Sequence, residues 1–152
     1  MRNLHPYLLV ALSLLPLSSI AQSSLCTQGE VTEWSCTAKG KIYSLCSSKN
    51  LSPTTGYMQY RAGTSSKTEF TFPEHSEQPK GYFRLGLLPR GARLTFSNAG
   101  YEYAIYEPLI GPTLIDVVKS QSPVASVTCS SATDTLTLTT TQDRFRLLGI
   151  YQ

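Results

Sequence analysis

Four cysteines carry the clearest chemistry in this chain, Cys26, Cys36, Cys46 and Cys129. In an exported protein an even number of thiols is typical of disulfides, and four cysteines allow three pairings. Zinc binding is the other common use of four thiolates, but no C-x-x-C pair occurs, so we expect no metal site. We favour the pairing of Cys26 with Cys46 and of Cys36 with Cys129.

One pairing is disfavoured by local geometry. The stretch that holds Cys36 and Cys46 predicts a β-hairpin folded about residues 39–40, because the glycine there can supply the positive φ that a tight turn needs. In that register Cys36 faces Tyr43 and Cys46 faces Glu33, so the two thiols do not face each other. We therefore expect each of these two cysteines to form a disulfide with a cysteine outside the hairpin.

The sequence contains few residues that could form a catalytic site. Beyond the first residues there is a single histidine, His75, in a polar segment where we expect an exposed loop, so a serine or cysteine nucleophile has one imidazole available at most. A carboxylate pair could form from Glu102, Glu107 or Asp116, but strand residues of this kind fall as easily on an exposed face. There is no G-x-S-x-G elbow and no glycine-rich phosphate loop. We predict no catalytic residues, no cofactor and no enzymatic activity.

Residues 1–21 have the pattern of a signal peptide, with a positive start, an apolar run and small residues before a cleavage site after Ala21. The apolar run is shorter than the roughly 20 residues that a spanning helix needs, so we expect no membrane span. Leu25 precedes the first cysteine, where a lipid anchor would need a small residue. The prediction is a periplasmic or secreted protein.

Residues 22–152 are expected to form a single domain, since this length suits one hydrophobic core. Without Arg2 this part holds 12 Lys and Arg against 10 Asp and Glu, a net charge of +2. The basic residues are scattered, whereas nucleic-acid-binding proteins concentrate them on one face, so we expect no nucleic-acid partner.

After the hairpin, short runs rich in Tyr, Phe, Val, Ile and Thr alternate with breaks of Gly, Pro, Ser and Asn. The expected strands cover residues 56–63, 68–73, 81–87, 92–96, 100–106, 113–119, 123–129, 135–139 and 145–151. No segment favours a helix over a strand. We predict an all-β fold, a single-domain antiparallel β-barrel or sandwich with short hairpins and two disulfides, and we lean towards the barrel because the hairpins are short.

Two stretches of the second half resemble the periplasmic and lipoprotein inhibitors of C-type lysozymes. Residues 97–103 (SNAGYEY) match a serine-glycine-tyrosine segment of that family, and Lys119 precedes an alanine-containing strand that ends in Cys129. That family consists of small β-barrels in which a disulfide joins an early strand to the last cysteine, here Cys36 with Cys129. Residues 44–46 and 56–61 also look like a group of uncharacterised exported bacterial proteins.

The resemblance implies a site that binds a protein partner, a lysozyme or another peptidoglycan hydrolase. In the inhibitor family a serine and a lysine reach the enzyme's catalytic carboxyl groups, and a cation presented to an acidic cleft is physically reasonable. The matching partner-binding residues are Ser97, Gly100, Tyr101, Tyr103 and Lys119. We expect a monomer.

A different hypothesis is a structural or envelope-assembly module that pairs through an exposed strand edge. The threonine-rich residues 135–139 and the last expected strand are the candidates for that edge. Tyrosines also gather in the middle strands, where they suit either strand packing or a recognition surface.

Overall fold

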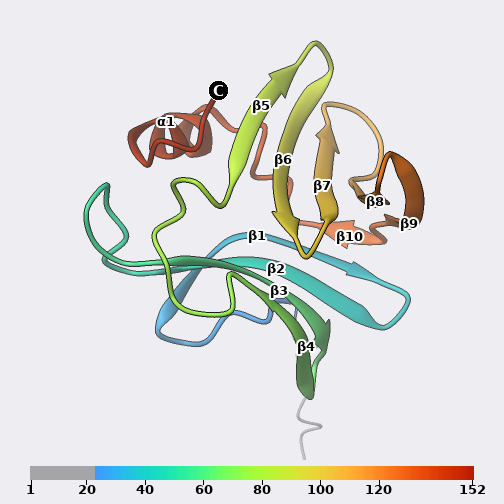
Figure 1. The fold of residues 1–152 in the computed structure, drawn as a ribbon, viewed down its shortest axis with the longest axis horizontal. Coiled ribbons are helices and arrows are strands. Elements are labelled where there is room, and N and C mark those ends of the chain that lie inside the picture. The colour runs from blue at the N-terminus through green and yellow to red at the C-terminus, as the bar shows by residue number, and fades with distance from the viewer. Residues whose placement is uncertain (1–22) are drawn as a thin grey trace, which may run out of the picture.

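The computed structural model describes residues 23–152, which form two β-sheets and one helix (Figure 1). The predicted signal peptide, residues 1–21, and its cleavage after Ala21 lie outside the described residues. Each sheet has five antiparallel strands. The all-β prediction with two disulfides is confirmed.

The first sheet has the strand order β10-β1-β2-β3-β4. Its members are β1 (Glu30–Ala38), β2 (Lys41–Ser48), β3 (Met58–Thr64), β4 (Lys67–Phe72) and the short β10 (Ser131–Ala132), which returns from the far end of the chain. The turn between β1 and β2 is the predicted one, with Lys39 and Gly40 at φ 50° and 77°.

The second sheet is a simple meander in the order β5-β6-β7-β8-β9. Its members are β5 (Arg84–Leu88), β6 (Gly91–Asn98), β7 (Tyr101–Pro108), β8 (Leu114–Lys119) and β9 (Ser122–Thr128). The predicted strands between residues 56 and 129 are thus confirmed.

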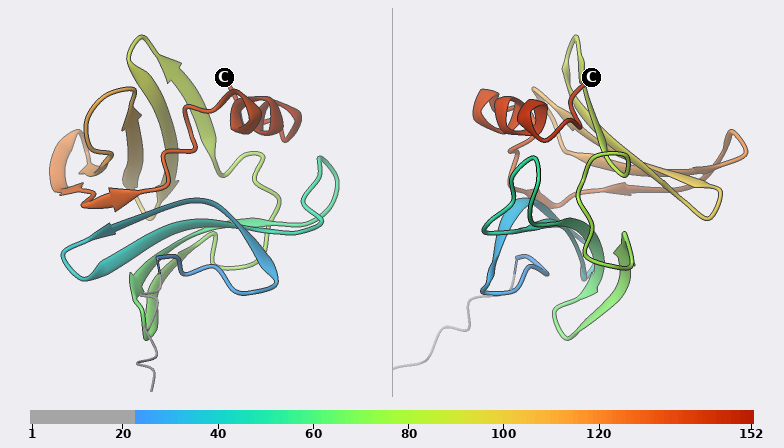
Figure 2. Two further views of the ribbon diagram at one scale, coloured as in Figure 1. Left: turned by 180° about the vertical axis from the view of Figure 1, so that it is seen from behind. Right: turned by 60° about the vertical axis from the view of Figure 1, so that its left-hand side comes forward.

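The two sheets face each other in a sandwich and do not close into a barrel (Figure 2). The lean towards a barrel is therefore corrected. It rested on uniformly short hairpins, and the connection of residues 73–83 breaks that pattern because it carries Pro73 and Pro79 and crosses from one sheet to the other. Aromatic rings fill the space between the sheets: Phe96 of the second sheet lies 4.9 Å from Tyr60 and 4.8 Å from Phe72 of the first, measured between ring centroids.

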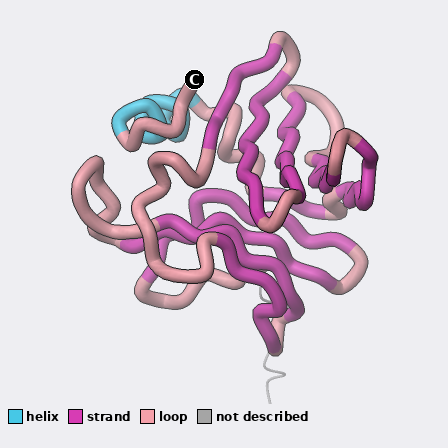
Figure 3. Tube along the Cα trace, in the orientation of Figure 1, coloured by secondary structure: helices cyan, strands magenta, loops and turns pink. Residues whose placement is uncertain are grey.

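The predicted last strand over residues 145–151, and with it the prediction that no helix forms, is wrong. Residues Thr139–Leu147 form α1, the segment drawn in cyan in Figure 3. Three threonines at its start favour a strand locally, but Phe145 and Leu148 lie three residues apart, so a helix turns both into the core, where they are 0% and 4% exposed. Within residues 23–152 no helix is long and apolar enough to cross a bilayer.

The predicted strand over residues 135–139 is also absent, and a buried carboxylate explains why. Glu107, at the end of β7, is fully buried and accepts hydrogen bonds from the backbone N–H groups of Leu136 and Thr137 at 3.1 and 2.8 Å. The hydroxyl of Thr137 donates to the same carboxylate at 2.7 Å. These bonds hold the backbone in a bend that a strand could not adopt.

Both favoured disulfides are present. Cys26 pairs with Cys46, and Cys36 pairs with Cys129, with Cα–Cα distances of 5.3 and 5.7 Å. Cys36 lies opposite Tyr43 as predicted, but Cys46 lies opposite Thr32 because the register of β1 shifts at Glu33. The second disulfide joins the first sheet to the residue that follows β9. Disulfides persist in oxidising compartments, so this is a protein of a non-cytoplasmic compartment.

Candidate functional site

The predicted partner-binding residues lie around one end of the second sheet. Two turns lie side by side there: residues 98–101, between β6 and β7, and residues 119–122, between β8 and β9. We call them the paired turns. They are neighbours because Tyr101 and Lys119 are partners in the register of β7 and β8.

Lys119 and Tyr101 interact directly. The Lys119 ammonium lies 4.6 Å from the centroid of the Tyr101 ring and 3.2 Å from its hydroxyl. Lys119 is exposed, and among residues 23–152 no carboxylate forms an ion pair with it. A cation held over an aromatic face and left without a counter-ion is available to a carboxylate from outside the chain.

Ser97 lies on the opposite face of the sheet from Lys119. In the register Ser97 is paired with Glu102 and Glu102 with Val118, so these three side chains share the outer face. Tyr101 and Lys119 share the face that looks towards the first sheet. The structure therefore brings Gly100, Tyr101 and Lys119 together at the paired turns but separates Ser97 from Lys119. Strand alternation across a two-residue turn could have indicated this from the sequence.

A shallow hollow of about 290 Å³ lies between the paired turns. It is lined by Gly100, Tyr101, Ser120 and Gln121 of the turns and, on the outer face of the sheet, by Ser97, Glu102 and Val118. Ser120 and Gln121 have φ of 49° and 64°, a left-handed conformation that costs residues with a Cβ energy. The hairpin turn at Lys39 and Gly40 has the same conformation, which is the usual one for a two-residue connection between antiparallel strands.

Tyr103 packs against aromatic residues between the two sheets. Its ring stacks on Phe96 at 4.7 Å and on Phe70 of the first sheet at 5.4 Å. Burial, together with the neighbouring Tyr101, raises the pKa of the Tyr103 hydroxyl above its usual value. This tyrosine therefore belongs to the packing between the sheets more than to the exposed surface.

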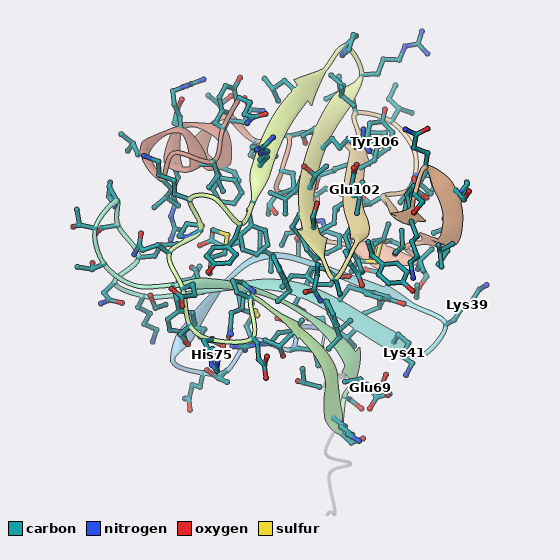
Figure 4. The ribbon with its side chains drawn as sticks, in the orientation of Figure 1. Lys39, Lys41, Glu69, His75, Glu102 and Tyr106 are labelled. Atoms are coloured by element: carbon teal, nitrogen blue, oxygen red, sulfur yellow. A yellow bond between two sulfur atoms is a disulfide. The ribbon has the colours of Figure 1, made fainter. Side chains whose placement is uncertain are left out.

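The carboxylates considered for catalysis do not form one cluster. Glu107 is buried in its hydrogen bonds with residues 136–137, as described above. Glu102 lies in an exposed ion pair with Arg93 at 3.3 Å, and Asp116 accepts a hydrogen bond from Ser126 at 2.6 Å. His75 lies in an exposed loop, away from Glu102 and Tyr106 (Figure 4). Among the described residues no group of three or more His, Cys, Asp or Glu side chains could hold a metal ion.

A second feature, at the other end of the same sheet, was missed by the sequence analysis. Leu87 and Leu88 at the end of β5, and Leu109 and Ile110 after β7, are all exposed. We call these four residues the apolar tip. A hollow of about 750 Å³ adjoins it. The sequence does show two dipeptides, Leu87-Leu88 and Leu109-Ile110, next to Pro or Gly residues that indicate turns. Turns usually carry polar residues, so these aliphatic pairs are unusual there.

Comparisons with known proteins add no relative: no family model, no curated protein and no solved structure matches this chain.

Proposed function

We propose that this is an exported binding protein that inhibits a cell-wall-active enzyme, a lysozyme or another peptidoglycan hydrolase, through the paired turns. The observation that supports this proposal most is the state of Lys119, an exposed ammonium placed over the Tyr101 ring with no carboxylate partner among the described residues. Glycoside hydrolases carry a pair of catalytic carboxyl groups in their clefts. An exposed cation would pair with those groups where they are desolvated.

The scaffold suits this function. The turns are short, they extend from strands fixed at both ends, and a disulfide joins the sheet that carries them to the opposite sheet. Rigid turns lose little conformational entropy on binding. Secretion or a periplasmic location is part of the same proposal, because the enzymes it would inhibit act on the cell wall.

The proposal is tested with an inhibition assay against a panel of lysozymes and peptidoglycan hydrolases. The oxidised protein should inhibit at least one of them at micromolar concentration, and Lys119→Ala should weaken inhibition at least tenfold. Lys49→Ala, an exposed lysine in the turn after β2, is the matched control and should inhibit like the unaltered protein. No inhibition of any enzyme, or equal inhibition by Lys119→Ala and the control, would refute the proposal.

A second candidate function, pairing through a strand edge, is favoured by one observation. β9 is an outer strand, it carries no charged residue, and all its residues except Val127 are exposed. Uncharged open edges are the ones that other strands can join. Light scattering separates the two candidates: concentration-dependent self-association that Ser126→Lys abolishes would favour assembly, and a monomer that captures one enzyme would favour inhibition.

A further inference from the structure

The apolar tip is a second surface, and it lies at the opposite end of the sheet from the paired turns. The turn between β5 and β6 protrudes from the body of the molecule, and the loop after β7 lies beside it (Figures 1 and 2). Leu109 and Ile110 are 67% and 93% exposed. Isolated exposed leucines are ordinary, but adjacent large aliphatic side chains at two neighbouring turn tips form a patch that indicates a binding surface.

The tip is held in place before any partner arrives. The backbone N–H of Leu109 donates a hydrogen bond to the carbonyl oxygen of Arg90 at 2.9 Å, which links the two turns. The hydroxyl of Tyr106 donates to the same carbonyl at 3.3 Å. Gly91 allows the backbones of β6 and β7 to lie close together beside these bonds, because a Cβ at this position would collide with the carbonyl oxygen of Glu107. The apolar side chains are therefore presented by a fixed backbone.

The segments that form the tip carry only positive charge, and the first carboxylate beyond them on β8 is that of Asp116. Residues 84–91 and 108–115 contain no Asp or Glu, and Arg90 lines the hollow beside the tip. The nearest carboxylate along β7, that of Glu107, is buried and accepts hydrogen bonds from the backbone of residues 136–137. Nothing in these two segments repels an anionic surface, and Arg90 would attract one.

The shape of the tip favours a deformable partner. A side chain that is 93% exposed stands out from the surface and would need a matching pocket in a rigid protein, whereas the boundary between lipid headgroups and acyl chains yields to it. The exposed Arg90, in the turn itself, and the half-buried Tyr106 line the hollow together with Leu109 and Ile110, and arginine and tyrosine are residues that contact the headgroup region in membrane-bound proteins. We propose that the apolar tip inserts into the interface of a bilayer that contains anionic phospholipid, and that the protein is thereby peripherally attached to a membrane.

Vesicle co-sedimentation of the full oxidised protein tests this. The probes are vesicles of phosphatidylcholine mixed with phosphatidylglycerol, and vesicles of phosphatidylcholine alone. The unaltered protein should sediment with the mixed vesicles and less with the neutral ones, and Ile110→Asp should lower the partition coefficient at least tenfold. Val124→Asp is the matched control, because Val124 is an exposed aliphatic residue on β9, at 55%. Arg90→Gln should remove the preference for the anionic vesicles.

The proposal fails if the unaltered protein does not sediment with the mixed vesicles, or if Ile110→Asp and Val124→Asp bind them equally. It also fails if the tip is a contact between copies, which gel filtration would show as self-association that Ile110→Asp abolishes without any vesicle binding. Lys119→Ala should bind vesicles like the unaltered protein, so this result is separable from the inhibition proposed for the paired turns.

Discussion

Two glutamates of β1 have opposite pKa shifts because their partners differ. Glu33 lies at the register shift of the strand, and burial raises the pKa of its carboxyl although Ser47 donates a hydrogen bond to it and Arg144 of α1 pairs with it at 2.9 Å. Burial also acts on Glu30, but a two-pronged ion pair with Arg61 outweighs it, and hydrogen bonds from Thr27 and Tyr57 add to the effect. The pKa of Glu30 is lowered from 4.5 to about 2.

Glu30→Gln should destabilise the fold by about 3 kcal/mol at neutral pH, because it leaves the Arg61 guanidinium buried without its counter-charge. In the unaltered protein this carboxyl contributes its full stability above its unfolded pKa of 4.5, and the contribution is lost as the pH falls towards 2. Urea unfolding at several pH values measures both effects.

The matched control for that experiment is Glu69→Gln. Glu69 pairs with Lys41 at 2.6 Å, but both side chains are more than 40% exposed, so the loss should stay within about 0.5 kcal/mol. If Glu30→Gln lost no more than this control, or kept the same decline in stability between pH 4.5 and 2, the role assigned to the buried pair would be wrong.

Two glycines of the second sheet differ in what surrounds them. Gly91 begins β6, and its Cα lies against the backbone of Glu107 and Pro108, whereas Gly86 of β5 has open space around it. Gly91→Ala should destabilise the fold by about 1–3 kcal/mol, because the added methyl group forces β6 and β7 apart. Gly86→Ala should be neutral or stabilise by up to about 1 kcal/mol. Thermal unfolding of the two variants measures the difference, and equal melting temperatures would contradict it.

The helix α1 depends on tertiary packing. It has no side-chain cap at its N-terminus, and its first turn has no acidic residue, so little local energy favours it. Its stability comes from Phe145 in the core and from the ion pair of Arg144 with Glu33. The last three residues then run beside β5, where Gln152 donates its backbone N–H to Leu85 at 2.9 Å.

Phe145→Ala should therefore cost about 3–5 kcal/mol of unfolding free energy, the usual loss for a buried aromatic ring. Leu147→Ala, which removes a side chain 73% exposed on the same helix, should change it by less than about 0.5 kcal/mol. Chemical denaturation followed by tryptophan fluorescence would report both. A similar loss for the two variants would mean that the helix does not pack as described.

The two disulfides should differ in their contribution to the stability of the whole molecule. Cys36–Cys129 closes a loop with a sequence separation of 93 and crosses from one sheet to the end of the other, whereas Cys26–Cys46 has a separation of 20. In the chain-entropy model the first contributes about 4.6 kcal/mol and the second about 3.3 kcal/mol. Each cysteine pair is replaced by alanines, and unfolding is followed under non-reducing conditions. Removal of Cys36–Cys129 should lower the free energy of unfolding more than removal of Cys26–Cys46. The reverse order would argue that the inter-sheet disulfide is not the main covalent constraint.

The strands were predictable because their residue pattern is local, and the disulfides were predictable because four cysteines allow only three pairings. Alternating apolar residues between turn residues located the strands, and a two-residue turn kept Cys36 and Cys46 apart, which left few pairings. The bulge at Glu33 was not visible in the same pattern, because an extra residue in one strand is recognised only from its partner strand.

Residues 135–151 show where local pattern is insufficient. Their threonines suit a strand, but Glu107, which lies far away in the sequence, accepts the backbone hydrogen bonds of residues 136–137, and the core accepts Phe145 only from a helix. The choice between sandwich and barrel, the opposite faces of Ser97 and Lys119 and the meeting of the two turns that form the apolar tip likewise depend on distant segments packing together. Periodicity along one strand describes which side chains share a face of that strand, whereas the partner of each face is a property of the folded chain.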